Sequence, residues 1–247
     1  IHHHYIPLEL IDEVKRNGKA LGVEYFPPKT DKDNPLQIQF PKGNRLNPDP
    51  RMAEVNNRLD VMTKGNVGIA TVEVHTACVG YELDGSRGET WSRLYNEGIM
   101  NLVKRHPDRF VGIATVPLQD PPRAAKVLEY AIRDLKMSGV TIASNVVGKY
   151  FDSKDFDPFW AKAQELDVPL LVHPSITKDK RVRAIPHNYQ INNVWEEYLA
   201  TLLYIATDVF DVFPRLKVVI CHAGGALSRH FNSDIRDGHP PRDDEPG

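Results

Sequence analysis

Hydrophobic residues along this chain fall into two alternating kinds of segment, short compact runs and longer periodic stretches. The short segments predict six strands, at 2–4, 66–75, 110–116, 140–143, 168–173 and 216–222. Between them, apolar residues recur every three or four positions, which predicts helices over 8–22, 51–64, 89–106, 121–137, 157–166 and 193–212. The last of these helices is apolar over most of its surface, which fits either a core helix or a subunit contact.

Strands that alternate with helices are typical of βαβ units around a parallel sheet, so we expect the α/β fold class. The 247 residues of the chain come close to the roughly 250 of an eight-stranded α/β barrel. No sequence repeat and no linker rich in serine and glycine divides the chain, and we therefore predict a single domain over 1–247.

Two segments lack a regular pattern. Residues 23–50 are rich in proline, and long loops of this kind are usually lids or binding loops, so we predict a long active-site loop there. Residues 234–247 are charged and rich in proline without an apolar face, which predicts an irregular or disordered end.

Composition and charge restrict the possible binding partners more than they restrict the possible folds. Lys and Arg number 31 and Asp and Glu 33, for a net charge of −2, so we expect no nucleic-acid partner. Apolar runs stay far below the roughly 20 residues of a membrane span, and the start lacks the features of a signal peptide. The only cysteines, Cys78 and Cys221, lie far apart in the sequence, so we expect no disulfide scaffold and a cytoplasmic protein.

Histidines at the ends of predicted strands are the candidates for chemistry. His2 and His4 are two residues apart, so in a strand both face the same side and can bind one metal ion, while His3 faces the other. His173 and His222 end two later strands. Because the carboxyl ends of parallel barrel strands form the active-site rim, three strands would bring imidazoles to one place.

Each histidine also has a plainer interpretation. The run His2–His4 could be the remnant of an affinity tag. His173 or His222 alone would more often be a buried structural residue, and His75 lines the pocket or supports the fold. The remaining candidates lie in polar surroundings and are interpreted as loop residues: His106, His187, His230 and His239.

These residues together resemble a known family. The segments that carry the resemblance are His2-x-His4-x-x-Pro7, Leu171-Val172-His173-Pro174, and Phe213-Pro214-x-Leu216-Lys217-Val218 followed by His222-Ala223-Gly224-Gly225. They resemble the amidohydrolase superfamily, above all its branch of aminocarboxymuconate semialdehyde decarboxylase and related metal-dependent decarboxylases. The likeness extends over nearly the whole chain and implies a (β/α)8 TIM barrel of the metal-dependent hydrolase type.

The resemblance also implies roles. His2, His4 and His173 would bind a divalent metal, Zn²⁺ in most of the family with Mn²⁺ as the other choice, and His222 would be the catalytic acid/base. Arg45 would bind the substrate carboxylate, with Arg51 as a weaker rival. Apart from the resemblance, His75 ends a predicted strand, and we expect it to contribute to substrate binding. Members of the family are often dimers, so we expect a homodimer.

The chain departs from the family pattern at two places. Ser175 stands where the family usually has an aromatic residue after His-Pro. The family's last metal ligand is an aspartate after the eighth strand, and Asp234, only 12 residues after His222 with no strand before it, does not take that role. With six predicted strands the barrel would be incomplete, and we expect the sequence to be part of a longer chain.

The function that we expect is a metal-dependent carbon–carbon lyase that releases CO₂ from an unsaturated or aromatic carboxylate. A hydrolase of a cyclic amide or lactone, or a hydratase, on the same scaffold is the main alternative, because fold alone does not choose among them. A non-catalytic paralogue is the third, since the final aspartate is absent from the sequence.

Overall fold

The computed structural model describes residues 1–30, 32–177, 179–185 and 189–226. The predicted irregular end at 234–247, with Asp234, lies outside the described residues. So do three of the histidines interpreted as loop residues: His187, His230 and His239.

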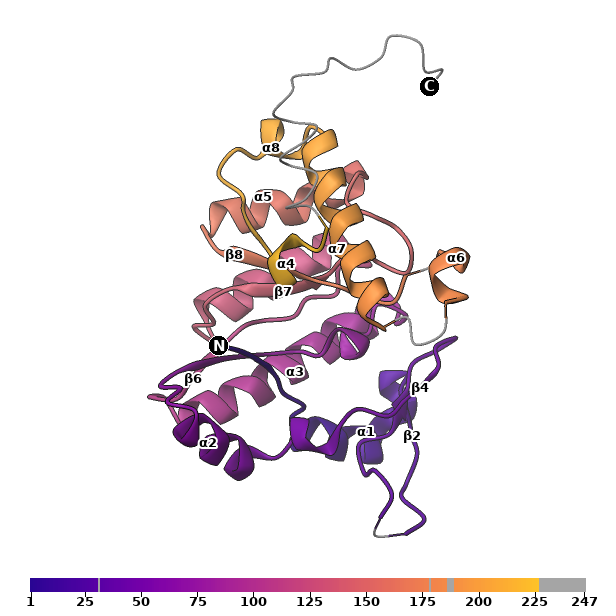
Figure 1. Cartoon of the computed structure of the whole chain (residues 1–247), viewed down its shortest axis with the longest axis vertical. Helices are drawn as coiled ribbons and strands as arrows, with labels where there is room; N and C mark the ends of the chain where they lie inside the picture. Colours follow the sequence, from indigo (N-terminus) through magenta and orange to yellow (C-terminus); the bar gives the residue numbers. More distant parts are fainter. Residues whose placement is uncertain (31, 178, 186–188, 227–247) are drawn as a thin grey trace.

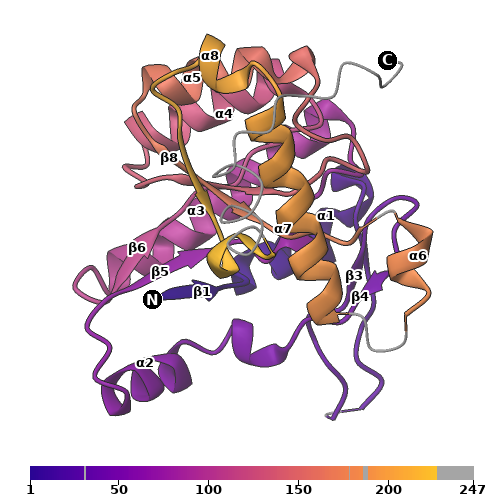
Figure 2. The same cartoon turned by 45° about the horizontal axis from the view of Figure 1, so that its top comes forward.

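Parallel strands form the centre of the molecule. They are β1 (His2–His4), β5 (Ala70–Glu73), β6 (Phe110–Gly112), β7 (Val140–Ala143), β8 (Pro169–His173) and β9 (Lys217–Ile220). β1, β5 and β6 form one parallel sheet and lie side by side in Figure 2, and β7, β8 and β9 form another. A parallel bridge between Ala114 and Val140 joins the two sheets into one curved series of strands that follow one another in chain order. Within the described residues, the two edge strands β1 and β9 do not pair with each other to close the series.

Helices cover this series. They are α1 (Leu8–Leu21), α2 (Val55–Lys64), α3 (Gly85–Arg105), α4 (Pro121–Arg133), α5 (Asp157–Glu165), α6 (Lys180–Arg183), α7 (Tyr189–Ala206) and α8 (Val209–Val212). α3, α4 and α5 lie next to one another in chain order (Figure 1). The α/β class is thus confirmed, with the alternation that the periodicity predicts.

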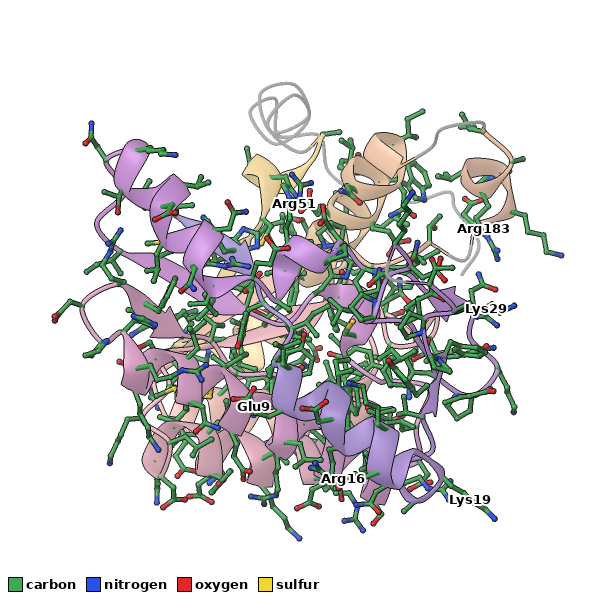
Figure 3. All side chains as sticks on the ribbon, turned by 90° about the horizontal axis from the view of Figure 1, so that it is seen from below. Glu9, Arg16, Lys19, Lys29, Arg51 and Arg183 are labelled. Atoms are coloured by element: carbon green, nitrogen blue, oxygen red, sulfur yellow. The ribbon has the colours of Figure 1, made fainter. Side chains whose placement is uncertain are left out.

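Amphipathic spacing explains how a helix such as α1 is placed. Leu10, Ile11 and Val14 are buried, as expected for positions that share one helical face. The charged residues Glu9 and Arg16 are exposed and appear along the outer side of α1 in Figure 3. Gly22 ends the helix in the left-handed conformation, with φ of 72°, which glycine adopts without steric cost.

The predicted count of six strands is too low. The described residues contain nine, because the segment 23–50 forms a small antiparallel sheet of β2 (Glu24–Tyr25), β3 (Ile38–Gln39) and β4 (Arg45–Leu46). Leu36, Ile38 and Phe40 alternate with glutamines and are buried, which is strand periodicity over only five residues. The surrounding prolines concealed this short pattern.

The predicted long helix at 193–212 is divided in two. α7 ends at Ala206 and α8 begins at Val209. The Thr207 hydroxyl donates a hydrogen bond to the Leu203 carbonyl at 2.6 Å, as threonines in a final helical turn often do. No helix of the described part has the length and apolar character that crossing a membrane would need.

Buried contacts hold β1 against the body of the molecule. The Tyr95 hydroxyl of α3 donates a hydrogen bond of 2.8 Å to the Tyr5 carbonyl, just after β1. The Tyr5 amide donates to the Glu73 carbonyl of β5 at 2.9 Å. Pro7 follows, and a Cβ added at Gly98 of α3 would lie 2.5 Å from the Pro7 Cβ. The segment 5–7, directly after β1, is therefore packed as part of the core.

This packing gives the first prediction. Gly98→Ala should gain about 1 kcal/mol from helix propensity, but we expect a net loss of about 1–3 kcal/mol from the collision with Pro7. Urea unfolding of the purified protein measures the difference. Gly68→Ala is the matched control, because no heavy atom lies within 4 Å of its added Cβ. An unchanged or higher stability of Gly98→Ala would contradict the close packing of this junction.

Candidate active site

Four side chains from three strands converge at the carboxyl ends of the parallel strands. His2 and His4 come from β1, Glu73 from β5 and His173 from β8, and one ligand atom of each lies within 4.8 Å of all the others. Parallel pairing sets His4 opposite Glu73, and curvature of the series brings β8 to β1. The rings of His4 and His173 are 4.8 Å apart between centroids.

Backbone hydrogen bonds set the orientation of two of these imidazoles. His4 Nδ1 lies 3.1 Å from the Val74 carbonyl oxygen, and His173 Nδ1 lies 3.2 Å from that of Pro174. A carbonyl only accepts, so each Nδ1 carries the proton and donates it. Nε2 of each ring is therefore left with its lone pair, the arrangement that most metal-binding histidines adopt.

Glu73 completes the donor set. Its side chain is fully buried, and its Oε2 accepts a hydrogen bond from the Thr141 hydroxyl of β7. Oε1 has no aligned hydrogen-bond donor among the described residues, and the nearest ligand atom is His2 Nε2 at 2.7 Å. A buried carboxylate oxygen without such a donor, beside imidazole lone pairs, fits a divalent cation; three imidazoles and a carboxylate suit zinc or manganese.

Burial and neighbours shift the pKa values of these histidines in opposite directions. Burial lowers the pKa of His4 to about 2 and that of His173 to about 4, with further lowering by neighbouring histidines. Contact with the Glu73 carboxylate raises the pKa of His2. At neutral pH, His4 and His173 are thus available as neutral ligands.

His3 faces away from this cluster, as the alternation predicts. Its Nδ1 lies 2.9 Å from a guanidinium nitrogen of Arg58 on α2. Arg58 also donates a hydrogen bond of 2.8 Å to the His4 carbonyl. The opposite faces of β1 therefore have separate roles, and His2–His4 form part of the folded sheet.

Two further histidines border the cluster. The His75 ring lies 4.9 Å from that of His4, and the His222 ring lies 5.1 Å from that of His173. His75 Nδ1 accepts a hydrogen bond from the Ala77 amide at 3.2 Å, which places its proton on Nε2. The structure thus brings together five of the six predicted site residues.

His222 is held in an unusual backbone conformation by the segment that follows β9. Its φ of 44° and that of Ala223, 57°, lie in the left-handed region, at a cost of roughly 1–2 kcal/mol for each. His222 Nδ1 lies 2.7 Å from Oε1 of Glu197, a fully buried carboxylate on α7. Burial raises the pKa of Glu197. Strain of this kind is typical of functional residues.

The two candidate arginines contact residues other than those of the cluster. Arg45 is on β4, and its guanidinium is 3.5 Å from the centroid of the Phe26 ring. It forms no ion pair with any described residue. Arg51, labelled in Figure 3, pairs with Asp49 instead.

Sequence reasoning missed two acidic residues of the site. Glu73 is the only charged residue in the run 70–74, and Glu197 lies in the largely apolar helix α7. The available signal was a charged residue among apolar neighbours that predict burial, because charged residues are almost never fully buried unless they are paired. Their partners come from distant strands, so the sequence did not identify them.

Comparisons with known proteins agree with this geometry. A family model described as Amidohydrolase matches residues 1–241. The decarboxylase orsB of Emericella nidulans is 31% identical over 185 residues, which cover 70% of this chain and 54% of the relative. Among solved structures, 2,6-dihydroxybenzoate decarboxylase from Rhizobium superposes with a TM-score of 0.71 at 21% identity, over 98% of this chain and 72% of that one.

A second solved structure contains a metal ion. Dihydroxybenzoic acid decarboxylase from Polaromonas sp. JS666, with bound manganese and the inhibitor 2-nitroresorcinol, superposes with a TM-score of 0.65 at 21% identity, over 95% of this chain and 68% of that one. These likenesses establish the fold. The chain spans about half the length of the curated relatives it matches: 54% of the decarboxylase orsB and 56% of the gamma-resorcylate decarboxylase of Polaromonas sp..

The geometry of the cluster predicts that metal binding requires the Glu73 carboxylate. Glu73→Gln keeps the size of the side chain and its acceptor for Thr141 but removes the charge. We expect the affinity for Zn²⁺ or Mn²⁺ to fall by at least about 100-fold, since even residues behind the ligands contribute 10- to 100-fold. Competition with a chromogenic chelator measures it, with the exposed Glu165→Gln as control. Equal affinities would remove Glu73 from the ligand set.

The lowered pKa values predict how the metal-free protein responds to acid. Unfolded His4 and His173 take up protons below their ordinary pKa of 6.5, whereas the folded rings do so only near 2 and 4. Stability should therefore fall between pH 6.5 and 4, by on the order of 3 kcal/mol for His173. The raised pKa of His2 acts oppositely, since its stabilisation is present at low pH and is lost as pH rises.

Urea unfolding at several pH values after chelator treatment measures this dependence. His173→Asn, which does not titrate, should give a flatter profile over the same range. A profile as steep as that of the parent protein would contradict the lowered pKa of His173.

Proposed function

The chain belongs to the amidohydrolase family, and from this membership we propose that it is a metal-dependent decarboxylase of an aromatic or unsaturated carboxylate. The observation that carries the proposal is the cluster of His2, His4, Glu73 and His173, with the Glu197-held His222 beside it. The decarboxylase names of relatives support this reaction over hydrolysis or hydration.

We propose Zn²⁺ or Mn²⁺ as the cofactor, held by His2, His4, Glu73 and His173. Bound there, a divalent ion supplies Lewis-acid stabilisation of negative charge on a substrate oxygen. The protein's part is to keep the imidazoles of His4 and His173 neutral by burial and to orient them through the carbonyls of Val74 and Pro174.

His222 is the proposed proton donor. Its Nδ1 proton is donated to Glu197, so Nε2 is the nitrogen that exchanges a proton with the substrate. In the reaction, a proton from Nε2 bonds to the ring carbon that carries the carboxylate. The bond from that carbon to the carboxylate then breaks, its electron pair stays with the ring, and CO₂ leaves. Glu197 stabilises the protonated imidazole before transfer and holds the ring in place.

Arg45 and His75 are the proposed substrate-binding residues. The Arg45 guanidinium stacks on Phe26 and has no ion-pair partner among the described residues, so its donors remain available for a carboxylate. His75 presents an Nε2 proton beside His4 and can donate to a substrate oxygen.

We also propose how the protein assembles and in which compartment it is located. We propose a homodimer, supported by exposed apolar residues of α7 such as Ile191, Val194 and Ile205. Two unpaired thiols, Cys78 and Cys221, support a reducing compartment such as the cytoplasm.

Release of CO₂ from a panel of hydroxylated benzoates tests the function. We expect turnover by the metal-loaded protein, and a 10²- to 10⁴-fold lower kcat in His222→Gln, the range that general acid catalysis contributes. Metal content should be unchanged, because His222 is outside the donor set. His106→Gln, at the end of α3, is the control variant.

Other outcomes point to other activities. Lactone or amide turnover without CO₂ release would favour the hydrolase, and water addition to an unsaturated acid would favour the hydratase. A metal-free protein after purification without chelator would favour the non-catalytic paralogue.

A further inference from the structure

A buried carboxylate on α7 organises a second polar group at the rim, separate from the metal donors. Glu196 is fully buried. Its Oε1 accepts a hydrogen bond from the Tyr150 hydroxyl at 2.9 Å, and its Oε2 accepts from the Ser144 hydroxyl at 2.8 Å and from Asn145 Nδ2 at 2.6 Å. Three neutral donors thus satisfy this carboxylate, and their hydrogens all point toward it.

Asn145 has only one possible orientation in this network. Its Oδ1 accepts a hydrogen bond of 2.8 Å from the Gly148 amide, so Nδ2 is the donor end. One Nδ2 hydrogen goes to Glu196 and the other to the Ser175 hydroxyl oxygen at 2.7 Å. Both amide hydrogens are therefore used, and Ser175 Oγ already accepts one hydrogen bond.

Ser175 is fixed at its backbone as well. Its amide donates to Ser144 Oγ at 3.0 Å, and its carbonyl accepts from Asn192 Nδ2 of α7 at 2.8 Å. The remaining mobile group is its hydroxyl hydrogen. Because the Ser144 proton is committed to Glu196, the Ser175 hydrogen is directed to Ser144 Oγ, 3.1 Å away, or to an outside acceptor.

The position of Ser175 decides which outside acceptor can reach that hydrogen. Ser175 follows the metal-site residue His173 at the end of β8, and its partner Ser144 follows the paired end of β7, so both serines lie at the carboxyl ends of the strands. Ser175 is partly exposed there. The Pro174 carbonyl between His173 and Ser175 also accepts from Thr76, the neighbour of His75, at 2.9 Å. Ser175 thus lies at the same end of the parallel strands as the histidine cluster.

We propose that Ser175 determines substrate specificity by donating its hydroxyl hydrogen to an acceptor atom on the ring substituent of the substrate. This rests on the proposed function for the substrate class. Asn145 is a positioning residue, because its hydrogen bond to one lone pair of the Ser175 oxygen orients the hydroxyl, and Glu196 holds Asn145 and Ser144. The site therefore favours a ring substituent that accepts a hydrogen bond over one that cannot.

Binding rather than turnover provides the test. Calorimetry on the metal-loaded protein compares benzoates that carry a methoxy or an ethyl group at ring position 2, 3 or 4, two groups of similar size of which only methoxy accepts. We expect methoxy to bind about three- to tenfold tighter at one position, the range of one neutral hydrogen bond. Ser175→Ala should abolish that ratio and Ser175→Thr should keep it. Ser86→Ala, on an exposed turn of α3, is the matched control.

A second variant reports on positioning. Asn145→Ala removes the hydrogen bond that orients the Ser175 hydroxyl, so the methoxy compound should lose part of its advantage over the ethyl compound at that same position. A change of stability alone would not alter this ratio.

The outcomes separate the two proposals. Equal methoxy and ethyl affinities at every position, or a ratio unchanged in Ser175→Ala, would overturn the role of Ser175. Binding with the expected ratio but without CO₂ release would leave that role intact and overturn decarboxylation. If no benzoate binds, the substrate class and the role of Ser175 are both wrong.

Discussion

The buried carboxylate of Glu73 is the constraint on which the site depends. An ionised carboxylate removed from water costs several kcal/mol unless opposite charge or hydrogen bonds compensate it. Thr141 satisfies one oxygen, and the other meets His2. In the metal-free protein, a proton on His2 supplies the compensating charge, which is why its pKa is raised. A divalent cation would supply the same charge to the whole donor set, so metal binding and proton release are linked.

That compensation works only if β1 stays in register beside β5. A shift by one residue would turn His3 toward the cluster and His2 and His4 away from it. Arg58 opposes such a shift by contacting both His3 and the His4 carbonyl from outside the sheet. Tyr95 fixes the chain directly after the strand, at the Tyr5 carbonyl. A three-residue strand therefore depends on helices α2 and α3 for its position.

Local periodicity was enough to predict the parallel strands and the helices between them, and the alternation of His2 and His4 was enough to predict their shared face. Glu73 was not predicted, because its role follows from which strand lies beside β1, a fact of pairing across about 70 residues. The three short strands within 23–50 were missed for a different reason. Each has two residues, fewer than a periodic signal needs, and the burial of Phe40 against Trp91 stabilises them. Arg45 and His75 as substrate-binding residues stay predictions.

Helix α7 shows why the ambiguity of an apolar helix matters for function. Its sequence fitted either a core helix or a subunit contact, yet two adjacent acids within it, Glu196 and Glu197, are both fully buried. Successive helical residues point about 100° apart, so the two carboxylates reach different neighbours: Glu197 contacts His222 after β9, and Glu196 contacts Ser144 and Asn145 after β7. One helix thus holds both the proposed proton donor and the polar group beside Ser175. Consecutive acids in an otherwise apolar helix are costly unless both are paired, and their presence is itself an indication that α7 serves the site as well as the core.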